Sequence, residues 1–128
     1  MSNEKIVLSH TAALDAALKH EPIEDEQKVA DETPHSTVTT GFDELGALNG
    51  NQVGIWAMSV GEMTDVETDE CFVVLSGRGT VHVLAENGFA EQSQNLVAGS
   101  VVLLHAGMRT VWTVEETLRK VYFTPSED

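Results

Sequence analysis

Short apolar runs alternate with turn-forming residues along the chain from Gly41 onward. The runs are rich in Val, Ile, Phe, Trp and Thr, which favour an extended backbone. They predict strands over residues 53–60, 71–76, 80–85, 100–105, 110–114 and 118–124. Many short strands separated by turns are typical of a β-sandwich or a β-barrel. No helical pattern lies between them, which argues against parallel βαβ units.

Glycine marks the predicted breaks between these strands. The breaks fall at Gly61, residues 77–79, Asn87-Gly88, residues 98–99 and residues 106–107. Because glycine has no Cβ, it reverses the chain without a steric penalty, and Asn also tolerates a positive φ. We therefore expect tight turns at these positions, and Asn87-Gly88 is the clearest hairpin signal.

The first forty residues differ in composition from the rest of the chain, since they are polar and include Pro22 and Pro34. Residues 11–20 contain four alanines, and two leucines lie four residues apart, which predicts a short helix. Pro22 discourages its continuation, and the acidic stretch that follows predicts a solvated connector. We accordingly expect an N-terminal helix and acidic connector over residues 1–35, followed by a β-barrel domain over residues 36–128.

Charge excludes two classes of partner. The formal net charge is −14, and only seven residues are Lys or Arg. Nucleic-acid binding needs clustered cations, and an anionic membrane surface would repel this chain. Cys71 is the one cysteine, so no internal disulfide can form. The chain start lacks a signal-peptide pattern and no apolar stretch approaches ~20 residues, so we expect a cytoplasmic protein.

Two segments resemble the motifs of a known family. The segment from Glu70 to Gly77 resembles the second half of the first cupin motif, with a Glu, six residues and a Gly. The segment from Gly99 to Thr110 resembles the second cupin motif, with His105 in the place of its Pro and Thr110 in the place of its His. This resemblance implies an all-β fold, a single-domain cupin jelly-roll barrel, here with a short N-terminal helix.

A smaller group within the cupins gives a closer resemblance over about residues 35–125. The shared pieces, in order, are Gly54-Ile55-Trp56, Glu70-Cys71, Leu75-Ser76-Gly77, Trp112 and Arg119-Lys120-Val121-Tyr122. Their order and spacing are similar to those of the ureidoglycine aminohydrolase group. We read Arg119 and Lys120 as facing opposite sides of one strand, where one of them could form a surface ion pair with the acidic run of residues 65–70. We read that run as a solvated loop that enters a strand.

The resemblance also bears on metal binding. Metal-dependent cupins hold an ion with two His and a Glu from the first motif and a His from the second. Here Glu70 alone matches, since no His lies between His35 and His82, and one carboxylate does not hold a transition metal tightly. We therefore predict no metal and no cofactor, although an atypical metal site that includes Glu70 stays an alternative.

Strand alternation suggests a candidate site. Glu70 and Phe72 share one face of their strand, and Thr110 and Trp112 share one face of theirs. Together they could surround a cavity with one carboxylate and one hydroxyl, a composition typical of small-molecule sites. Trp56 could line the same cavity or pack in the core. A filled core in which Thr110 or a nearby donor satisfies Glu70 is equally compatible with the sequence.

Three functions follow from these alternatives. The first is a metal-free cupin that binds a small-molecule ligand in the barrel. The second is an enzyme acting on a small polar metabolite, with Glu70 as the acid or base. The third is a structural partner of another protein, with a filled barrel. In each case we expect a homodimer, because pairing protects exposed edge strands from aggregation.

Overall fold

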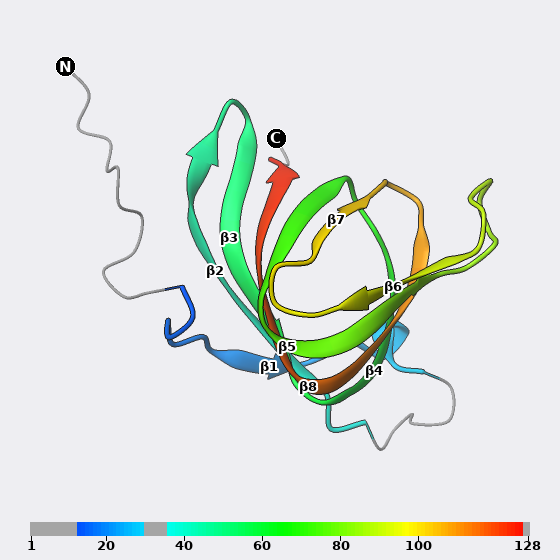
Figure 1. Cartoon of the computed structure of the whole chain (residues 1–128), viewed down its shortest axis with the longest axis horizontal. Coiled ribbons are helices and arrows are strands. Elements are labelled where there is room, and N and C mark those ends of the chain that lie inside the picture. Colours follow the sequence, from blue (N-terminus) through cyan, green and yellow to red (C-terminus); the bar gives the residue numbers. More distant parts are fainter. Residues whose placement is uncertain (1–12, 30–35, 127–128) are drawn as a thin grey trace.

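The computed structural model describes residues 13–29 and 36–126, which fold into a barrel of antiparallel strands (Figure 1). These residues form eight strands and one short 3-10 helix, η1 (Asp25–Gln27). The strands are β1 (His20–Pro22), β2 (Thr39–Leu48), β3 (Asn51–Met58), β4 (Gly61–Val66), β5 (Glu70–Val83), β6 (Gln92–Leu96), β7 (Val101–Leu104) and β8 (Arg109–Pro125). The predicted all-β fold is therefore confirmed.

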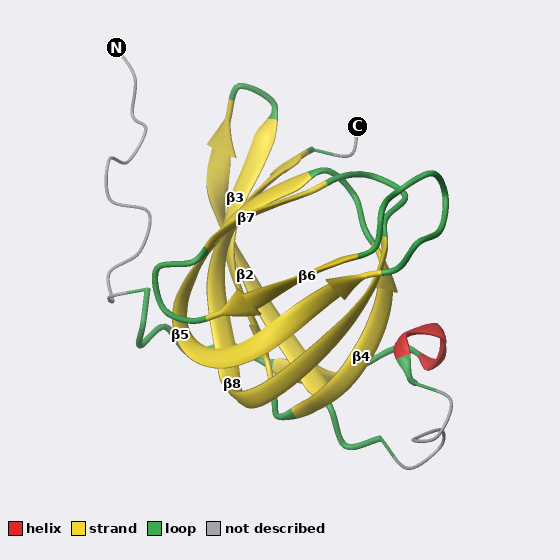
Figure 2. Cartoon of the chain, turned by 45° about the vertical axis from the view of Figure 1, so that its right-hand side comes forward, coloured by secondary structure: helices red, strands yellow, loops and turns green. Residues whose placement is uncertain are grey.

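Two long strands, β5 and β8, belong to both walls of the barrel (Figure 2). In one wall, the second half of β8 lies between β3 and the first half of β5, which also pairs with β7. In the other wall, the first half of β8 lies between β4 and the second half of β5, which also pairs with β6. Because both strands bend from one wall into the other, their inner faces enclose one core.

The bend in β5 lies at two glycines. The pairing between β5 and β8 shifts register repeatedly along this stretch. A Cβ on Gly77 would lie 2.1 Å from the carbonyl oxygen of Thr117, and one on Gly79 would lie 2.4 Å from that of Thr113. Glycine alone allows two backbones to approach so closely. The turn predicted at residues 77–79 is therefore a bulged corner within one continuous strand.

The observed strands differ from the predicted ones in two further ways. The predicted strands over residues 110–114 and 118–124 are also one strand, β8. Strands β1, β2, β4 and β6 were absent from the prediction because polar residues and glycine interrupt or outnumber their apolar residues. In β6, for example, the sequence is Gln-Ser-Gln-Asn-Leu and Leu96 is the one buried residue.

The helix predicted over residues 11–20 is not seen in the described part of that range. Residues 13–15 form a turn, residues 16–19 have no regular structure, and residues 11 and 12 lie outside the described residues. The guanidinium of Arg119 donates hydrogen bonds of 2.9 and 2.8 Å to the carbonyls of Ala13 and Ala16. This contact with β8 outweighs the helix propensity of the alanines.

The apolar core occupies the space between the two walls. Phe72, Val81, Leu96, Trp112 and Leu118 are each no more than 1% exposed. The ring of Trp112 packs against Phe72 and Trp56, at centroid distances of 5.6 and 5.4 Å. In the part of the chain that the structure describes, no helix is long and apolar enough to cross a membrane.

Candidate functional site

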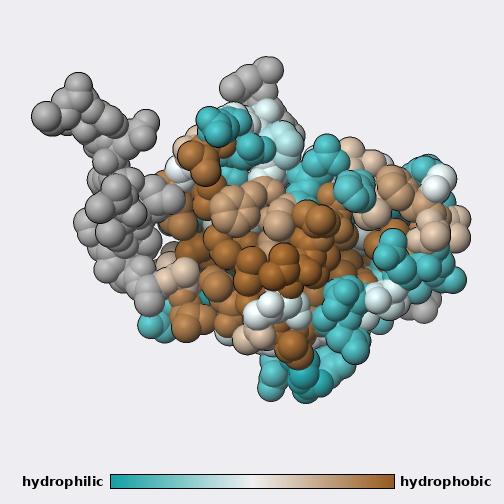
Figure 3. Space-filling model, turned by 45° about the horizontal axis from the view of Figure 1, so that its top comes forward, coloured by the Kyte–Doolittle hydropathy of each residue, from teal (hydrophilic) through white to brown (hydrophobic). Residues whose placement is uncertain are grey.

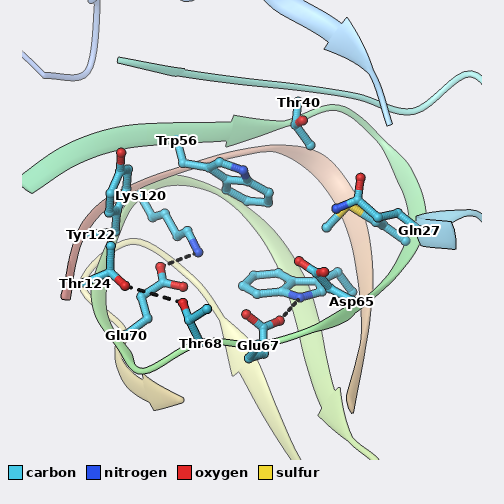
Figure 4. Close-up of a pocket in the computed structure, with 12 residues that line it drawn as sticks. Gln27, Thr40, Trp56, Asp65, Glu67, Thr68, Glu70, Lys120, Tyr122 and Thr124 are labelled. Atoms are coloured by element: carbon cyan, nitrogen blue, oxygen red, sulfur yellow. Dashed lines mark hydrogen bonds and ion pairs between the residues drawn. The ribbon is translucent and has the colours of Figure 1, made fainter. Parts of the chain in front are cut away.

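A cavity of about 170 Å³ lies beside the core (Figure 4). Trp112 belongs both to the core and to the lining of the cavity. Aromatic faces, threonine hydroxyls, three carboxyls and one ammonium share its lining. The charged and indole-bearing residues among them are Trp56, Asp65, Glu67, Glu70, Trp112 and Lys120. This mixture of aromatic surface and convergent polar groups is typical of a small-molecule site.

A buried ion pair forms one wall of the cavity. Lys120 Nζ lies 2.6 Å from Glu70 Oε2, and the two side chains are 5% and 11% exposed. The same ammonium lies 4.4, 4.2 and 4.7 Å from the ring centroids of Trp56, Phe72 and Trp112. Figure 4 shows the Lys120 and Glu70 side chains pointing toward each other. Three ring faces and one carboxylate therefore compensate for the lost hydration of the ammonium.

Strand register brings these groups together. Lys120 in β8 lies opposite Trp56 in β3 and opposite Val74 in β5. Side chains of directly paired residues point to the same face of a sheet, so Lys120 faces the barrel interior with Trp56. Glu70 is the first residue of β5 and reaches the ammonium from the neighbouring strand.

A second carboxyl group lies beneath Trp112. Glu67 Oε2 accepts hydrogen bonds of 2.6 Å from the Thr110 hydroxyl and 3.1 Å from the Trp112 indole N–H. Backbone hydrogen bonds with Met108 and Gly107, of 2.8 and 2.9 Å, hold Glu67 in place. Burial raises the pKa of the Glu67 carboxyl, while the bond from Thr110 lowers it by a smaller amount.

Asp65 is the third carboxyl group of the cavity. It lies on β4, and its Oδ1 accepts a 2.9 Å hydrogen bond from the backbone N–H of Val66. Burial raises the pKa of Asp65 as well, and the hydrogen bonds from Val66 and Gln27 oppose that increase. Since Glu70 is paired with the single ammonium, Asp65 and Glu67 leave the cavity with an excess of acidic groups.

The structure brings together three of the five residues that the sequence suggested. Trp56, Glu70 and Trp112 line the cavity. Phe72 and Thr110 are fully buried and lie behind its surface, where Phe72 contacts Trp112 and Thr110 donates to Glu67.

The sequence analysis missed most of the cavity lining, including the charged or titratable residues Asp65, Glu67 and Lys120. Glu67 belongs to the acidic run that we read as a solvated loop, and Lys120 was read as part of a surface pair. The sequence signal for Lys120 was the period-two alternation of Leu118, Lys120 and Tyr122, because residues two apart share one face of a strand. That face points into the barrel, where Leu118 is fully buried. Arg119, on the opposite face, contacts residues 13–16 instead.

The residues present do not fit the metal site of metal-dependent cupins. Glu70 is the one match to that ligand set, and its Oε2 is bonded to an ammonium that would repel a metal cation. The described histidines, His20, His82 and His105, do not line the cavity. Within the described ranges, no group of three or more His, Cys, Asp or Glu side chains could hold a metal ion.

A bent antiparallel barrel with a polar cavity beside its core defines a small, single-barrel β domain. The family comparison identifies it more closely. The model of the EutQ-like cupin domain matches residues 45–122, so the chain belongs to the EutQ-like cupin family. The cupin assignment is confirmed, whereas the comparisons give no support to the ureidoglycine aminohydrolase group. None of the curated proteins matches the chain.

Solved structures agree on the fold. The Clostridium difficile EutQ protein has a TM-score of 0.57 and 15% identity, and the match covers 84% of this chain and 82% of that one. Ectoine synthase from P. lautus has a TM-score of 0.58 and 13% identity, and the match covers 82% of this chain and 69% of that one. A protein of unknown function from Acidithiobacillus ferrooxidans has a TM-score of 0.54 and 21% identity, and the match covers 84% of this chain and 89% of that one. At these identities, the likeness extends to the fold alone.

Proposed function

We propose that this chain is a cupin domain that binds a small polar molecule in the cavity beside Trp112. One observation carries the proposal. The buried Lys120–Glu70 pair lies in the wall of an open space instead of in a filled core. Burying two charges costs several kcal/mol per ion before their attraction is counted, and that arrangement is typical of sites that recognise a ligand.

The charged groups of the cavity indicate which charge a ligand should carry. Glu70 neutralises Lys120, while Asp65 and Glu67 add acidic character to the same cavity. The whole chain carries a formal net charge of −14, so an anionic ligand would approach against its field. We therefore propose a neutral or cationic ligand with polar groups that bond the threonine hydroxyls and an apolar part that packs on the indoles.

Enzymatic turnover of such a molecule is the alternative. Glu70 is held by Lys120, so Glu67, whose carboxyl pKa is raised by burial, is a second candidate for the acid or base. The resemblance to ureidoglycine aminohydrolase finds no support in the comparisons, so this alternative rests on those two carboxyl groups.

A cytoplasmic location stays part of the proposal, on the acidic composition and the single cysteine.

Tryptophan fluorescence offers a direct test of binding. The chain has two tryptophans, Trp56 and Trp112, and both line the cavity. Titration with three-carbon probes that differ in charge, 1-propanol, propylamine and propionate, should give a saturable change with the first two. We expect propionate to bind roughly tenfold more weakly, a difference of about 1.4 kcal/mol.

A matched variant isolates the charge preference. Asp65→Asn keeps a side-chain oxygen for the Val66 N–H and removes the negative charge. It should bring the affinities for propylamine and propionate closer together and leave that for 1-propanol unchanged. A linear response without saturation for all three probes would show that the cavity does not bind small polar molecules.

We also propose that two copies associate through the outer face of β7 and its neighbours. Val101 and Leu103 are 65% and 66% exposed there, and Phe123 on β8 is 39% exposed. Pairing places Leu103 beside Cys71 and Cys71 beside Phe123, so these apolar side chains form a continuous row. Figure 3 shows apolar side chains over the middle of this face. An uncharged face is where two copies of a strongly acidic chain repel each other least.

Sedimentation velocity tests the homodimer. We expect the wild-type chain to sediment as a dimer, and the dimer to strengthen with salt because salt screens the repulsion between acidic chains. Leu103→Glu should give a monomer by placing a charge in the apolar face. Val60→Glu, at a 55% exposed position between β3 and β4, is the matched control and should stay dimeric. A wild-type monomer at all salt concentrations would contradict the proposal.

A further inference from the structure

Lys120 differs from the other described lysines in its surroundings. Its side chain is 5% exposed, whereas those of Lys28 and Lys19 are 17% and 89% exposed and do not line the cavity. It lines the cavity, so its amine is accessible to a molecule bound there. A largely buried lysine that borders an open cavity can act as a nucleophile once a neighbouring base has taken its proton.

Resting on the proposed binding function, we propose that Lys120 forms a reversible imine with a small neutral aldehyde or ketone in the cavity. Three features of the site support this step. Glu70 Oε2 lies 2.6 Å from Nζ, close enough to accept a proton directly. The cavity of about 170 Å³ admits a small molecule next to Nζ. The acidic groups at Asp65 and Glu67 disfavour anionic carbonyl compounds.

The step balances without an oxidant or a reductant. One proton moves from the Lys120 ammonium to Glu70, and the neutral amine then bonds to the carbonyl carbon while the π electrons move to oxygen. That oxygen takes a proton from the nitrogen, which gives a carbinolamine. Glu70 next returns its proton to the hydroxyl, which leaves as water while the nitrogen lone pair forms the C=N bond. One ammonium and one carbonyl compound thus give one iminium and one water.

The surroundings of Nζ suit the product as well as the starting amine. The iminium carries the same positive charge as the ammonium that it replaces. The ring faces of Trp56, Phe72 and Trp112 and the Glu70 carboxylate therefore stabilise a cation at both ends of the step. The charge that the site has to hold is therefore the same before and after the step.

Reductive trapping tests the proposal on the wild-type chain. The full chain is incubated with glycolaldehyde and sodium cyanoborohydride, which reduces an imine to a stable amine, and peptide mass mapping locates the adducts. We expect Lys120 to be labelled at least about tenfold faster than the exposed Lys19, because the cavity positions the aldehyde beside Nζ. Labelling of Lys120 at or below the rate of Lys19 would overturn the proposal.

Two variants assign the roles of the ion pair. Glu70→Gln removes the proton acceptor and should slow labelling of Lys120 by roughly 10²-fold, with Lys19 unchanged. Lys120→Arg keeps a cation in the aromatic cage and should abolish the adduct. Unchanged labelling of Lys120 in Glu70→Gln would contradict the proton-transfer role of Glu70.

Fluorescence separates failure of this step from failure of the binding function. A saturable change in tryptophan fluorescence with glycolaldehyde and 1-propanol, without an adduct on Lys120, rejects the imine and leaves the binding site standing. No fluorescence change and no adduct rejects both.

Discussion

Gly77→Ala should destabilise the protein by at least about 3 kcal/mol. Gly77 has a φ of +92°, which costs a residue with a Cβ on the order of 1–2 kcal/mol. The added Cβ would also lie 2.1 Å from the carbonyl oxygen of Thr117 and 2.7 Å from the Cα of Leu118. Both are backbone atoms of β8, so no side chain can move aside to relieve the contact, and the two central strands must separate.

Gly88→Ala is the matched control, because it isolates the cost of the backbone conformation. Gly88 has a φ of +87°, and a Cβ there would meet no atom within 4 Å. We expect a loss of about 1 kcal/mol, reduced by the lower entropy of the unfolded chain. Urea unfolding at a fixed protein concentration, followed by tryptophan fluorescence, measures both variants. Equal losses for Gly77→Ala and Gly88→Ala would show that β5 and β8 are not in close contact at this corner.

The same glycines show how far the sequence determines the fold. Apolar periodicity located β5, β7 and β8, which alternate buried with more exposed residues, but it missed the polar strands that complete the walls. Glycine signals a break in a strand pattern, however, and not the kind of break. A turn and a bulged corner both need a residue without a Cβ, and only the position of the partner backbone distinguishes them. That partner lies about forty residues further along the chain.

The candidate site was predictable to a similar extent. The motif resemblance selected Glu70 and the two tryptophans, and the structure places all three at one cavity. Lys120 was read as a surface residue because charged side chains are seldom buried without a partner. Its partner is Glu70, in a strand fifty residues away, and the three rings that complete its surroundings come from three different strands. Such convergence depends on strand register, which the local sequence does not specify.

Glu67 was missed for a different reason. The run of residues 65–70 is acidic, and an acidic run usually faces solvent. Hydrogen bonds from Thr110 and Trp112 make burial of Glu67 favourable, and those donors lie in β8. A sequence signal was present, since Trp needs an acceptor for its indole N–H when it is buried.

Lys120→Met should be more destabilising than Glu70→Gln. Removing the ammonium leaves the Glu70 carboxylate partly buried, 11% exposed, and without its cation, a change that typically costs about 3–5 kcal/mol. Glu70→Gln leaves the ammonium buried, but the faces of Trp56, Phe72 and Trp112 still attract it, at about 0.5–2 kcal/mol each. We therefore expect a loss of roughly half that size for Glu70→Gln.

The double variant completes the cycle. Lys120→Met together with Glu70→Gln removes both charges, and replacing a buried ion pair with neutral groups is often close to neutral in stability. We expect its free energy of unfolding to lie within about 1.5 kcal/mol of the wild-type value, a coupling of 2 kcal/mol or more between the two sites. This variant should nevertheless lose the reaction with glycolaldehyde, because a stable barrel without the amine cannot form an imine. Additive losses in the single and double variants, measured by urea unfolding, would show that the two charges do not compensate each other inside the barrel.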